Sequence, residues 1–375
     1  MIKILLVTQT NHTGLTYHRQ LVPHMNLEQN YAYQVIPCTD INSVTDEQLK
    51  DFHIVSFLRL IDSEGKSVEI IKRCKKAGCK VIIDIDDYWF LHPKHALNQL
   101  YKEKNIAEQT VDGLREADCV TTTTEFFAAK IRQINPQTIV LPNAIDPTEK
   151  QFKSKHIYSD KLRIGWIGGI YHEQDIRLLY EGFNEVYKDV NNDLFQFCLG
   201  GFNLNESYKY MEAVFTNNFK NIKNKQYIEL LKQYMPIRKD IEETQPYRRL
   251  YGKSVFEYAT LYNELDVNLV PLYSNNFNSY KSQIKIIEAG FFKKACIVSN
   301  VMPYTIDCTN NNTILVNPTK RNDGWGTAIK SLIKNPNRIE DLGEALYETV
   351  KDKYNINTVN VLRNQLYQEL CSVLA

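Results

Sequence analysis

The sequence has no excess of charge of either sign, and its cysteines and histidines do not form a pattern typical of a metal site. The 45 lysine and arginine residues are nearly balanced by 44 aspartates and glutamates. This balance gives no reason to expect a strongly charged partner such as nucleic acid. The eight cysteines include no C-x-x-C pair, and the eight histidines form no H-E-x-x-H motif. We therefore expect reduced thiols, a cytoplasmic protein and no bound zinc.

Long hydrophobic runs are also missing. The apolar run at residues 1–8 is too short to cross a membrane, and no small-residue cleavage site follows it, so we expect a strand there instead of a signal or an anchor. The 375 residues with 43% hydrophobic content are enough to bury two separate cores, which favours two domains.

Short apolar runs separated by segments of helix length recur through the first part of the chain. This alternation predicts one doubly wound α/β domain over residues 1–150. The expected strands are Lys3–Val7, Tyr33–Pro37, Ile54–Phe57, Lys80–Ile85, Cys119–Thr122 and Thr138–Leu141. The polar stretch at residues 146–160 is the best candidate for a linker.

A second series of apolar runs predicts a second α/β domain over residues 151–355. Its expected strands are Leu162–Gly169, Leu194–Leu199, Asp266–Leu272, Cys296–Val298 and Thr313–Val316. Residues 203–245 interrupt this domain with interleaved aromatic and basic residues, which could meet a membrane surface or an anionic acceptor. We favour an ordinary helical insertion with solvated lysines over such a contact. Apolar residues at spacings of three and four predict a final helix over residues 356–375.

The segment from Asn278 to Gly290 lies between two apolar strands and places two lysines and a carboxylate near the start of a helix. Lys281 and Lys285 are four residues apart, so we expect them to share one helical face, and Ser282 lies between them. Helix N-termini attract anions, and the carboxylate of Glu288 could accept hydrogen bonds from vicinal sugar hydroxyls. This combination suits the phosphate and ribose of a nucleotide. A surface helix with a simple ion pair is the alternative.

Three aspartates, Asp84, Asp86 and Asp87, lie at the end of the fourth expected strand. Adjacent carboxylates there could orient a hydroxyl group or take its proton. Such carboxylates would also suit magnesium or manganese, but alternating strand residues point to opposite faces and Asp87 follows the strand, so we expect no metal. Asp87 could instead cap a turn or helix.

Loops that follow expected strands supply further candidates for ligand contact. Glycines there would let a ligand approach the backbone, although turn geometry, surface exposure or an ordinary ion pair would explain the same residues. These candidates are Gly14, His18, Arg19, Arg59, Gly168, Gly169 and His172.

Four segments in this order resemble the GT-B glycosyltransferases, especially those similar to glycosyltransferase family 4. They are residues 80–91, 140–146, 163–169 and 281–290. The resemblance runs the length of the chain. It implies two Rossmann-like domains facing a cleft, with an acceptor site in the first domain, a nucleotide-sugar donor site in the second and a C-terminal helix that packs back toward the first.

The resemblance also implies roles for the candidate residues. Basic side chains and helix N-termini would neutralise the donor diphosphate without a metal ion or cofactor. Expected catalytic residues are Asp86 and Asp87. Expected donor contacts are Gly14, Gly168, Gly169, His172, Lys281, Ser282, Lys285 and Glu288. Expected acceptor or cleft contacts are His18, Arg19 and Arg59.

The chain departs from the family pattern at three places. Tyr280 stands where the first of two glutamates is common, and Asp86 stands where a histidine is common. Residues 168–175 lack the usual arginine and lysine. These departures leave the contacts to the donor sugar open and require the phosphate-binding charge to come from elsewhere, for which the helix after Lys281 is the candidate.

The expected activity is retaining transfer of a hexose from a nucleoside diphosphate to a glycan, lipid-linked or protein acceptor in surface polysaccharide assembly. The expected location is the cytoplasm, with peripheral contact to the inner membrane face as an option. If the enzyme inverts, Asp86 or Asp87 becomes the general base. Two alternatives stay open: a sugar-nucleotide epimerase on the same fold, and a non-catalytic binding or scaffold protein, because a fold does not establish a function.

Overall fold

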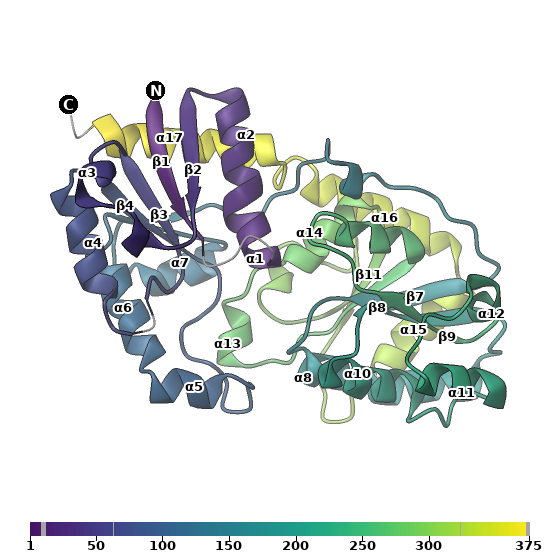
Figure 1. Ribbon diagram of the computed structural model, residues 1–375. Coiled ribbons are helices and arrows are strands. Elements are labelled where there is room, and N and C mark those ends of the chain that lie inside the picture. Colours follow the sequence, from purple (N-terminus) through teal and green to yellow (C-terminus); the bar gives the residue numbers. More distant parts are fainter. Residues whose placement is uncertain (9–12, 63, 323, 373–375) are drawn as a thin grey trace. The chain divides into compact units, whose positions relative to one another are not determined.

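The chain forms two compact units, each built on a parallel sheet (Figure 1). The computed structural model describes residues 1–8, 13–62, 64–322 and 324–372. Unit 1 comprises Met1–Asp146, Asn275–Ser282 and Asp352–Ala375, and unit 2 comprises Pro147–Ser274 and Gln283–Lys351. A short segment from the second half of the chain therefore belongs to the first unit.

The sheet of unit 1 has six parallel strands in the order β2-β1-β3-β4-β5-β6. All six expected strands of this half are present, each within one residue at either end. They are β1 (Ile2–Val7), β2 (Tyr33–Cys38), β3 (Ile54–Leu58), β4 (Lys80–Ile85), β5 (Cys119–Thr122) and β6 (Thr138–Val140). The order reverses between β1 and β3, and ligands of open α/β sheets bind beyond the carboxyl ends of the strands at such a reversal.

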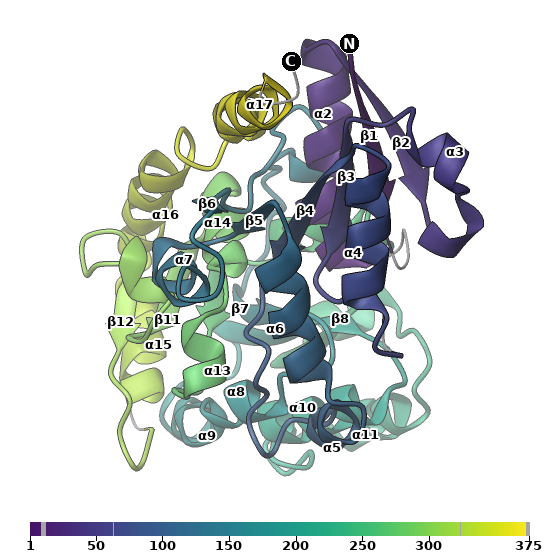
Figure 2. The same cartoon turned by 90° about the vertical axis from the view of Figure 1, so that its left-hand side faces the viewer.

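Helices surround this sheet, and α4 packs beside α6 (Figure 2). The last helix, α17, packs on α2, where the side chain of Asn360 donates to the carbonyl of Pro23 at 2.8 Å. The helices are α1 (Gly14–Thr16), α2 (Val22–Asn30), α3 (Asp46–Leu49), α4 (Ser67–Lys76), α5 (Asn98–Glu103), α6 (Ile106–Glu116), α7 (Glu125–Ile131), α13 (Asn276–Ser279) and α17 (Ile356–Ser372). A π-helical turn, Tyr17–Leu21, joins α1 to α2.

The sheet of unit 2 has the strand order β12-β11-β10-β7-β8-β9, which reverses between β7 and β10. Its strands are β7 (Leu162–Ile167), β8 (Phe195–Phe202), β9 (Tyr247–Tyr251), β10 (Val267–Val270), β11 (Ala295–Ser299) and β12 (Ile314–Val316). The sequence did not predict β9, because two arginines occupy this buried strand. The guanidinium of Arg249 is buried, and it donates hydrogen bonds through Nε and Nη2 to the two carboxylate oxygens of Glu212, at 2.6 and 2.7 Å.

The helices of unit 2 include three within residues 203–245, where the sequence predicted a helical insertion. They are α8 (Glu173–Arg177), α9 (Tyr180–Asp189), α10 (Glu206–Thr216), α11 (Lys225–Lys232), α12 (Lys239–Glu243), α14 (Ile284–Phe291), α15 (Gly324–Lys334) and α16 (Asn337–Val350). Four basic residues of the insertion form ion pairs with nearby acidic residues: Lys209, Lys232, Arg238 and Lys239.

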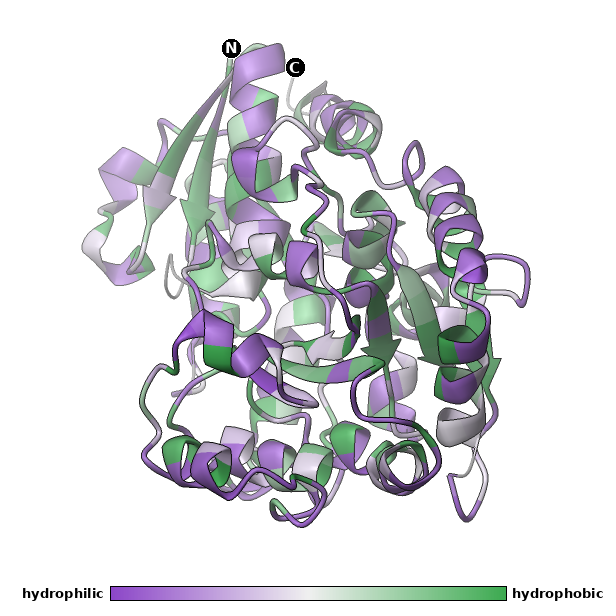
Figure 3. Cartoon of the chain, turned by 90° about the vertical axis from the view of Figure 1, so that its right-hand side faces the viewer, coloured by the Kyte–Doolittle hydropathy of each residue, from purple (hydrophilic) through white to green (hydrophobic). Residues whose placement is uncertain are grey.

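Burial follows hydropathy in both units. The strands are coloured as hydrophobic in Figure 3, whereas the helices carry both hydrophilic and hydrophobic residues, as amphipathic helices on a sheet do. Phe57 and Ile83 belong to the core of unit 1, and Trp166 and Phe197 belong to the core of unit 2. Within the described ranges, no helix combines the length and the hydrophobicity needed to cross a bilayer.

Candidate functional site

The two loops at the strand-order reversal of unit 2 are held together by Asp175. One carboxylate oxygen of Asp175 accepts a hydrogen bond from the backbone N–H of Tyr273, after β10, at 2.7 Å. The other lies 2.8 Å from Nδ1 of His172, in the loop after β7. Because Asp175 is buried, this bridge fixes His172 at the carboxyl ends of the two strands, where a ligand of this type of sheet binds.

Lys285 lies at the same edge, against the backbone that follows β7. Its Nζ donates to the carbonyl of Ile167 at 2.6 Å and lies 4.7 Å from the ring centroid of Trp166. A Cβ atom at Gly168 would come within 2.5 Å of this nitrogen and 2.4 Å of the Trp166 ring, whereas a Cβ at Gly169 would meet nothing within 4 Å. Glycine at 168 therefore lets the ammonium approach the backbone closely.

Lys281 and Lys285 do not share a helical face, and this expectation is wrong. Helix α14 begins at Ile284, and Lys281 lies before it in the segment that belongs to unit 1. Ring contacts of Tyr280 hold that segment: its ring centroid lies 4.6 Å from that of Tyr88 and 5.1 Å from that of Phe126. No pattern in the local sequence could reveal this, because both partners are distant in the chain.

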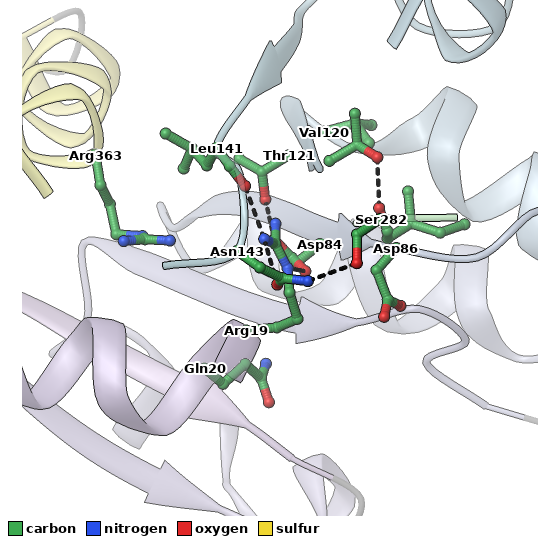
Figure 4. Close-up of polar contacts among 12 residues, drawn as sticks. Arg19, Gln20, Asp84, Asp86, Val120, Thr121, Leu141, Asn143, Ser282 and Arg363 are labelled. Atoms are coloured by element: carbon green, nitrogen blue, oxygen red, sulfur yellow. Dashed lines mark hydrogen bonds and ion pairs between the residues drawn. The ribbon is translucent and has the colours of Figure 1, made fainter. Parts of the chain in front are cut away.

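Ser282 ends the same segment, where its hydroxyl oxygen accepts a hydrogen bond from Asn143 Nδ2 at 2.8 Å (Figure 4). Asn143 belongs to the 140–146 motif. The expected donor contacts Lys281 and Ser282 are thus placed in unit 1, while Lys285 and Glu288 are placed on α14 of unit 2.

The carboxylate of Glu288 is buried and accepts hydrogen bonds from two tyrosines. Oε2 accepts from the hydroxyl of Tyr262 at 2.8 Å, and Oε1 accepts from the hydroxyl of Tyr258. Burial, with the nearby charge of Glu288, raises the pKa of Tyr262 well above its usual value, so this phenol remains a donor. Both tyrosines lie in the segment Tyr258–Glu264 after β9, and nothing in the local sequence links them to Glu288.

In unit 1, Arg59 follows β3 and forms ion pairs with two of the three aspartates near the end of β4. Its Nε donates to Oδ1 of Asp86 and its Nη2 donates to Oδ2 of Asp87, both at 2.6 Å. Arg59 adopts a left-handed backbone conformation with φ of 53°, which is uncommon for a residue with a side chain. Lys281 Nζ lies 3.7 Å from the remaining oxygen of Asp87.

The two neighbouring carboxyl groups differ in acidity. Burial raises the pKa of Asp86, and the charge of Arg59 offsets this only in part. Burial also opposes ionisation of Asp87, but the charges of Lys281 and Arg59 outweigh it and lower the pKa of Asp87 to about 2. Environments that push two neighbouring pKa values apart allow two carboxyl groups to take different roles.

Asp84 and Arg19 form a separate buried pair (Figure 4). The guanidinium donates through Nε and Nη2 to the two oxygens of Asp84, at 2.8 and 2.7 Å, and through Nη1 to the carbonyl of Leu141 at 2.7 Å. Thr121 Oγ1 adds a hydrogen bond of 2.6 Å to Asp84. Arg19 is 2% exposed and Asp84 is 4% exposed, so neither has much access to a ligand. The pair joins the helical turn Tyr17–Leu21 to strand β4.

The other candidates near β1 lie at the start of the following helical segment. Gly14 is exposed, and a Cβ there would meet nothing within 4 Å. His18 is buried, with its ring edge-on to Tyr17 at 4.9 Å between centroids. Among the residues that the structure describes, no three histidine, cysteine or acidic side chains are grouped so as to hold a metal ion.

The fold matches solved structures over nearly the whole chain. Sucrose-phosphate synthase from Thermosynechococcus elongatus is 15% identical with a TM-score of 0.68, covering 100% of both chains. Anabaena HepE, solved with UDP and glucose, is 12% identical with a TM-score of 0.62, covering 98% of this chain and 100% of its own. A glycosyltransferase from Rickettsia africae is 13% identical with a TM-score of 0.60, covering 98% of both.

These likenesses show that the two Rossmann-like units have the GT-B glycosyltransferase fold. No protein-family model matches the sequence, and no curated protein matches it.

Proposed function

We propose that this GT-B chain transfers a sugar from a nucleoside diphosphate donor to a glycan acceptor. The observation that carries the proposal is the ammonium of Lys285, held against the backbone before Gly168 at the strand-order reversal of unit 2. That edge is where this type of sheet binds nucleotides. The HepE structure with UDP and glucose supports a sugar nucleotide as the ligand, as does the resemblance to glycosyltransferase family 4.

In the proposed reaction, unit 2 binds the donor diphosphate. Lys285 attracts the phosphate oxygens, the backbone of Gly168 and Gly169 allows close approach, and His172 contributes a ring N–H from its Asp175-bound position. Negative charge grows on the diphosphate as the glycosidic bond breaks, and a fixed cation stabilises that charge. We propose that these groups act without a metal ion. Contacts from Gly14, Lys281 and Ser282 to the donor stay predictions.

Unit 1 is the proposed acceptor side. Asp86 and Asp87, fixed by Arg59, orient the acceptor hydroxyl. In a retaining reaction, the leaving phosphate oxygen accepts the proton of that hydroxyl on the face from which it departs. We propose retention and a hexose donor because of the family resemblance. We propose that His18 contacts the acceptor. Arg19 instead stabilises unit 1 through its buried hydrogen bonds to Asp84.

The setting of the reaction is also a proposal. We propose a role in surface polysaccharide assembly in the cytoplasm, with glycan, lipid-linked or protein acceptors. A peripheral membrane contact would use helices α10, α11 and α12. The ion pairs of four basic residues there leave less positive charge for anionic lipid than the sequence alone suggested.

Turnover of a panel of nucleoside diphosphate sugars, followed by ³¹P NMR with a mixture of glycan acceptors, tests the proposal. We expect one donor to release its nucleoside diphosphate together with an α- or β-linked product of unchanged anomeric configuration. The Asp86→Asn, Asp87→Asn double variant should lose turnover while binding the donor. The matched control is Asp112→Asn, an exposed aspartate paired with Arg115 on α6.

One result would contradict the function itself, and another would contradict only the roles of Asp86 and Asp87. Isomerisation of the donor sugar without release of nucleoside diphosphate would indicate an epimerase. Full turnover in the double variant would remove Asp86 and Asp87 from the reaction.

A further inference from the structure

Glu288 is held by two tyrosines that differ in burial. Tyr262 is fully buried and donates to Oε2, whereas Tyr258 is only partly buried and donates to Oε1. Both belong to the 3₁₀-helical segment Tyr258–Glu264, after β9. Tyr262 is therefore part of the core, while Tyr258 lies nearer to the surface.

The position of Glu288 relates it to the proposed phosphate site. Lys285 and Glu288 are three residues apart on α14, a spacing that places both on one face of a helix. In a nucleoside diphosphate the ribose is joined directly to the phosphates, and its two vicinal hydroxyls are hydrogen-bond donors. A carboxylate one turn along from the phosphate-binding lysine is suited to accept from them.

We infer that Tyr258 occupies the hydrogen-bonding position on Glu288 that the ribose of the donor takes, so that the tyrosine and the nucleotide compete for one carboxylate oxygen. This inference rests on the proposed function. A buried carboxylate without donors is costly, and the Tyr258 hydroxyl satisfies it in the absence of a nucleotide. Tyr262 keeps the carboxylate oriented in both states.

The competition has a measurable consequence. A ligand that must displace an internal group binds more weakly than one that enters an open position. Removing the hydroxyl in Tyr258→Phe should therefore tighten binding of the matching ribonucleoside diphosphate. A typical hydrogen bond contributes roughly 0.5–1.5 kcal/mol net, which corresponds to about a 2- to 13-fold lower Kd.

Calorimetric titration with ribonucleoside diphosphates and their 2′,3′-dideoxy analogues tests this inference. The dideoxy analogues lack both ribose hydroxyls and cannot donate a hydrogen bond to Oε1 of Glu288. Their Kd should therefore be the same for the wild-type chain and Tyr258→Phe. Tyr258→Leu, which also lacks the hydroxyl, should behave like Tyr258→Phe. The matched control is Tyr251→Phe, because the Tyr251 hydroxyl donates to the Met235 carbonyl and not to Glu288.

Each outcome separates this inference from the function on which it rests. Weaker ribonucleotide binding in both Tyr258 variants, or an equal change for dideoxy analogues, would overturn the competition while leaving a nucleotide site in place. If no nucleoside diphosphate binds the wild-type chain or any variant, the proposed function fails, and the inference fails with it.

Discussion

Replacing Asp84 with asparagine should destabilise unit 1 strongly. Asp84 accepts two hydrogen bonds from Arg19 and one from Thr121, and all three side chains are buried. Arg363, also buried, lies within the electrostatic reach of both charges: burial lowers its pKa, the charge of Arg19 lowers it further and the charge of Asp84 opposes this. Neutralising Asp84 leaves the guanidinium of Arg19 in the interior without its carboxylate.

The size of the effect follows from the geometry. Removing one partner of a buried ion pair destabilises a protein by about 3–5 kcal/mol, because the remaining charge is desolvated and unpaired. Asparagine keeps one acceptor oxygen, which in the Oδ2 position could still accept from Arg19 Nη2 and Thr121 Oγ1. Two of the three hydrogen bonds can therefore persist, and we expect the lower end of this range, about 3 kcal/mol. The exposed control Asp112→Asn interrupts an ion pair whose side chains are 54% and 61% exposed, for which little change is expected.

Urea unfolding followed by hydrogen exchange of peptides from unit 1 measures this difference, since two units need not unfold together. We expect a lower urea midpoint for unit 1 in Asp84→Asn, with an unchanged denaturant dependence. A change no larger than that of Asp112→Asn would refute the view that the pair with Arg19 holds unit 1 together.

Three further predictions concern His24, Gly168 and Lys281. Burial lowers the pKa of His24 to about 3, so an unfolded chain binds a proton below about pH 6.5 that the folded chain does not. Stability should therefore fall as pH drops from 6.5 toward 3, less steeply in His24→Gln; equal slopes in urea unfolding would contradict this. Gly168→Ala should weaken binding of a nucleoside diphosphate sugar in calorimetry, because its Cβ would crowd the Lys285 ammonium, whereas Gly169→Ala should not; equal losses would argue against a phosphate site there. Lys281→Met should raise the pKa of Asp87 from about 2, since it removes the largest attractive charge. Ionised Asp87 stabilises the folded chain above its unfolded pKa of about 3.9, and this stabilisation is lost as the pH falls toward 2. In Lys281→Met the stabilisation should be smaller. An unchanged titration of the Asp87 carboxyl group in ¹³C NMR would refute this role of Lys281.

The fold was largely predictable from the sequence because apolar runs mark buried parallel strands directly. The strand β4, for example, begins and ends at the expected residues, Lys80 and Ile85. The exception is β9, where Arg249 sits in a buried strand because Glu212, on a helix of the insertion, neutralises it. Such compensation between residues far apart in the chain is invisible to a pattern of hydropathy.

The candidate site was less predictable, for the same physical reason. The lysines near Ser282 were expected on one helix because of their spacing, but aromatic contacts of Tyr280 keep Lys281 with unit 1. Spacing on a helix decides which side chains are neighbours only where the helix exists. Tertiary packing also set the partners of Glu288, since neither Tyr258 nor Tyr262 has a feature in the sequence that points to a carboxylate.

The donor site proposed around Lys285 can be tested by calorimetric titration of the wild-type chain and of Lys285→Met with a panel of nucleoside diphosphate sugars. We expect one nucleoside diphosphate sugar to bind the wild-type chain with one site per molecule. Lys285→Met should lose most of this affinity while keeping the same melting temperature. Binding of no sugar nucleotide, or binding that is equally tight in Lys285→Met, would contradict a donor site built around Lys285.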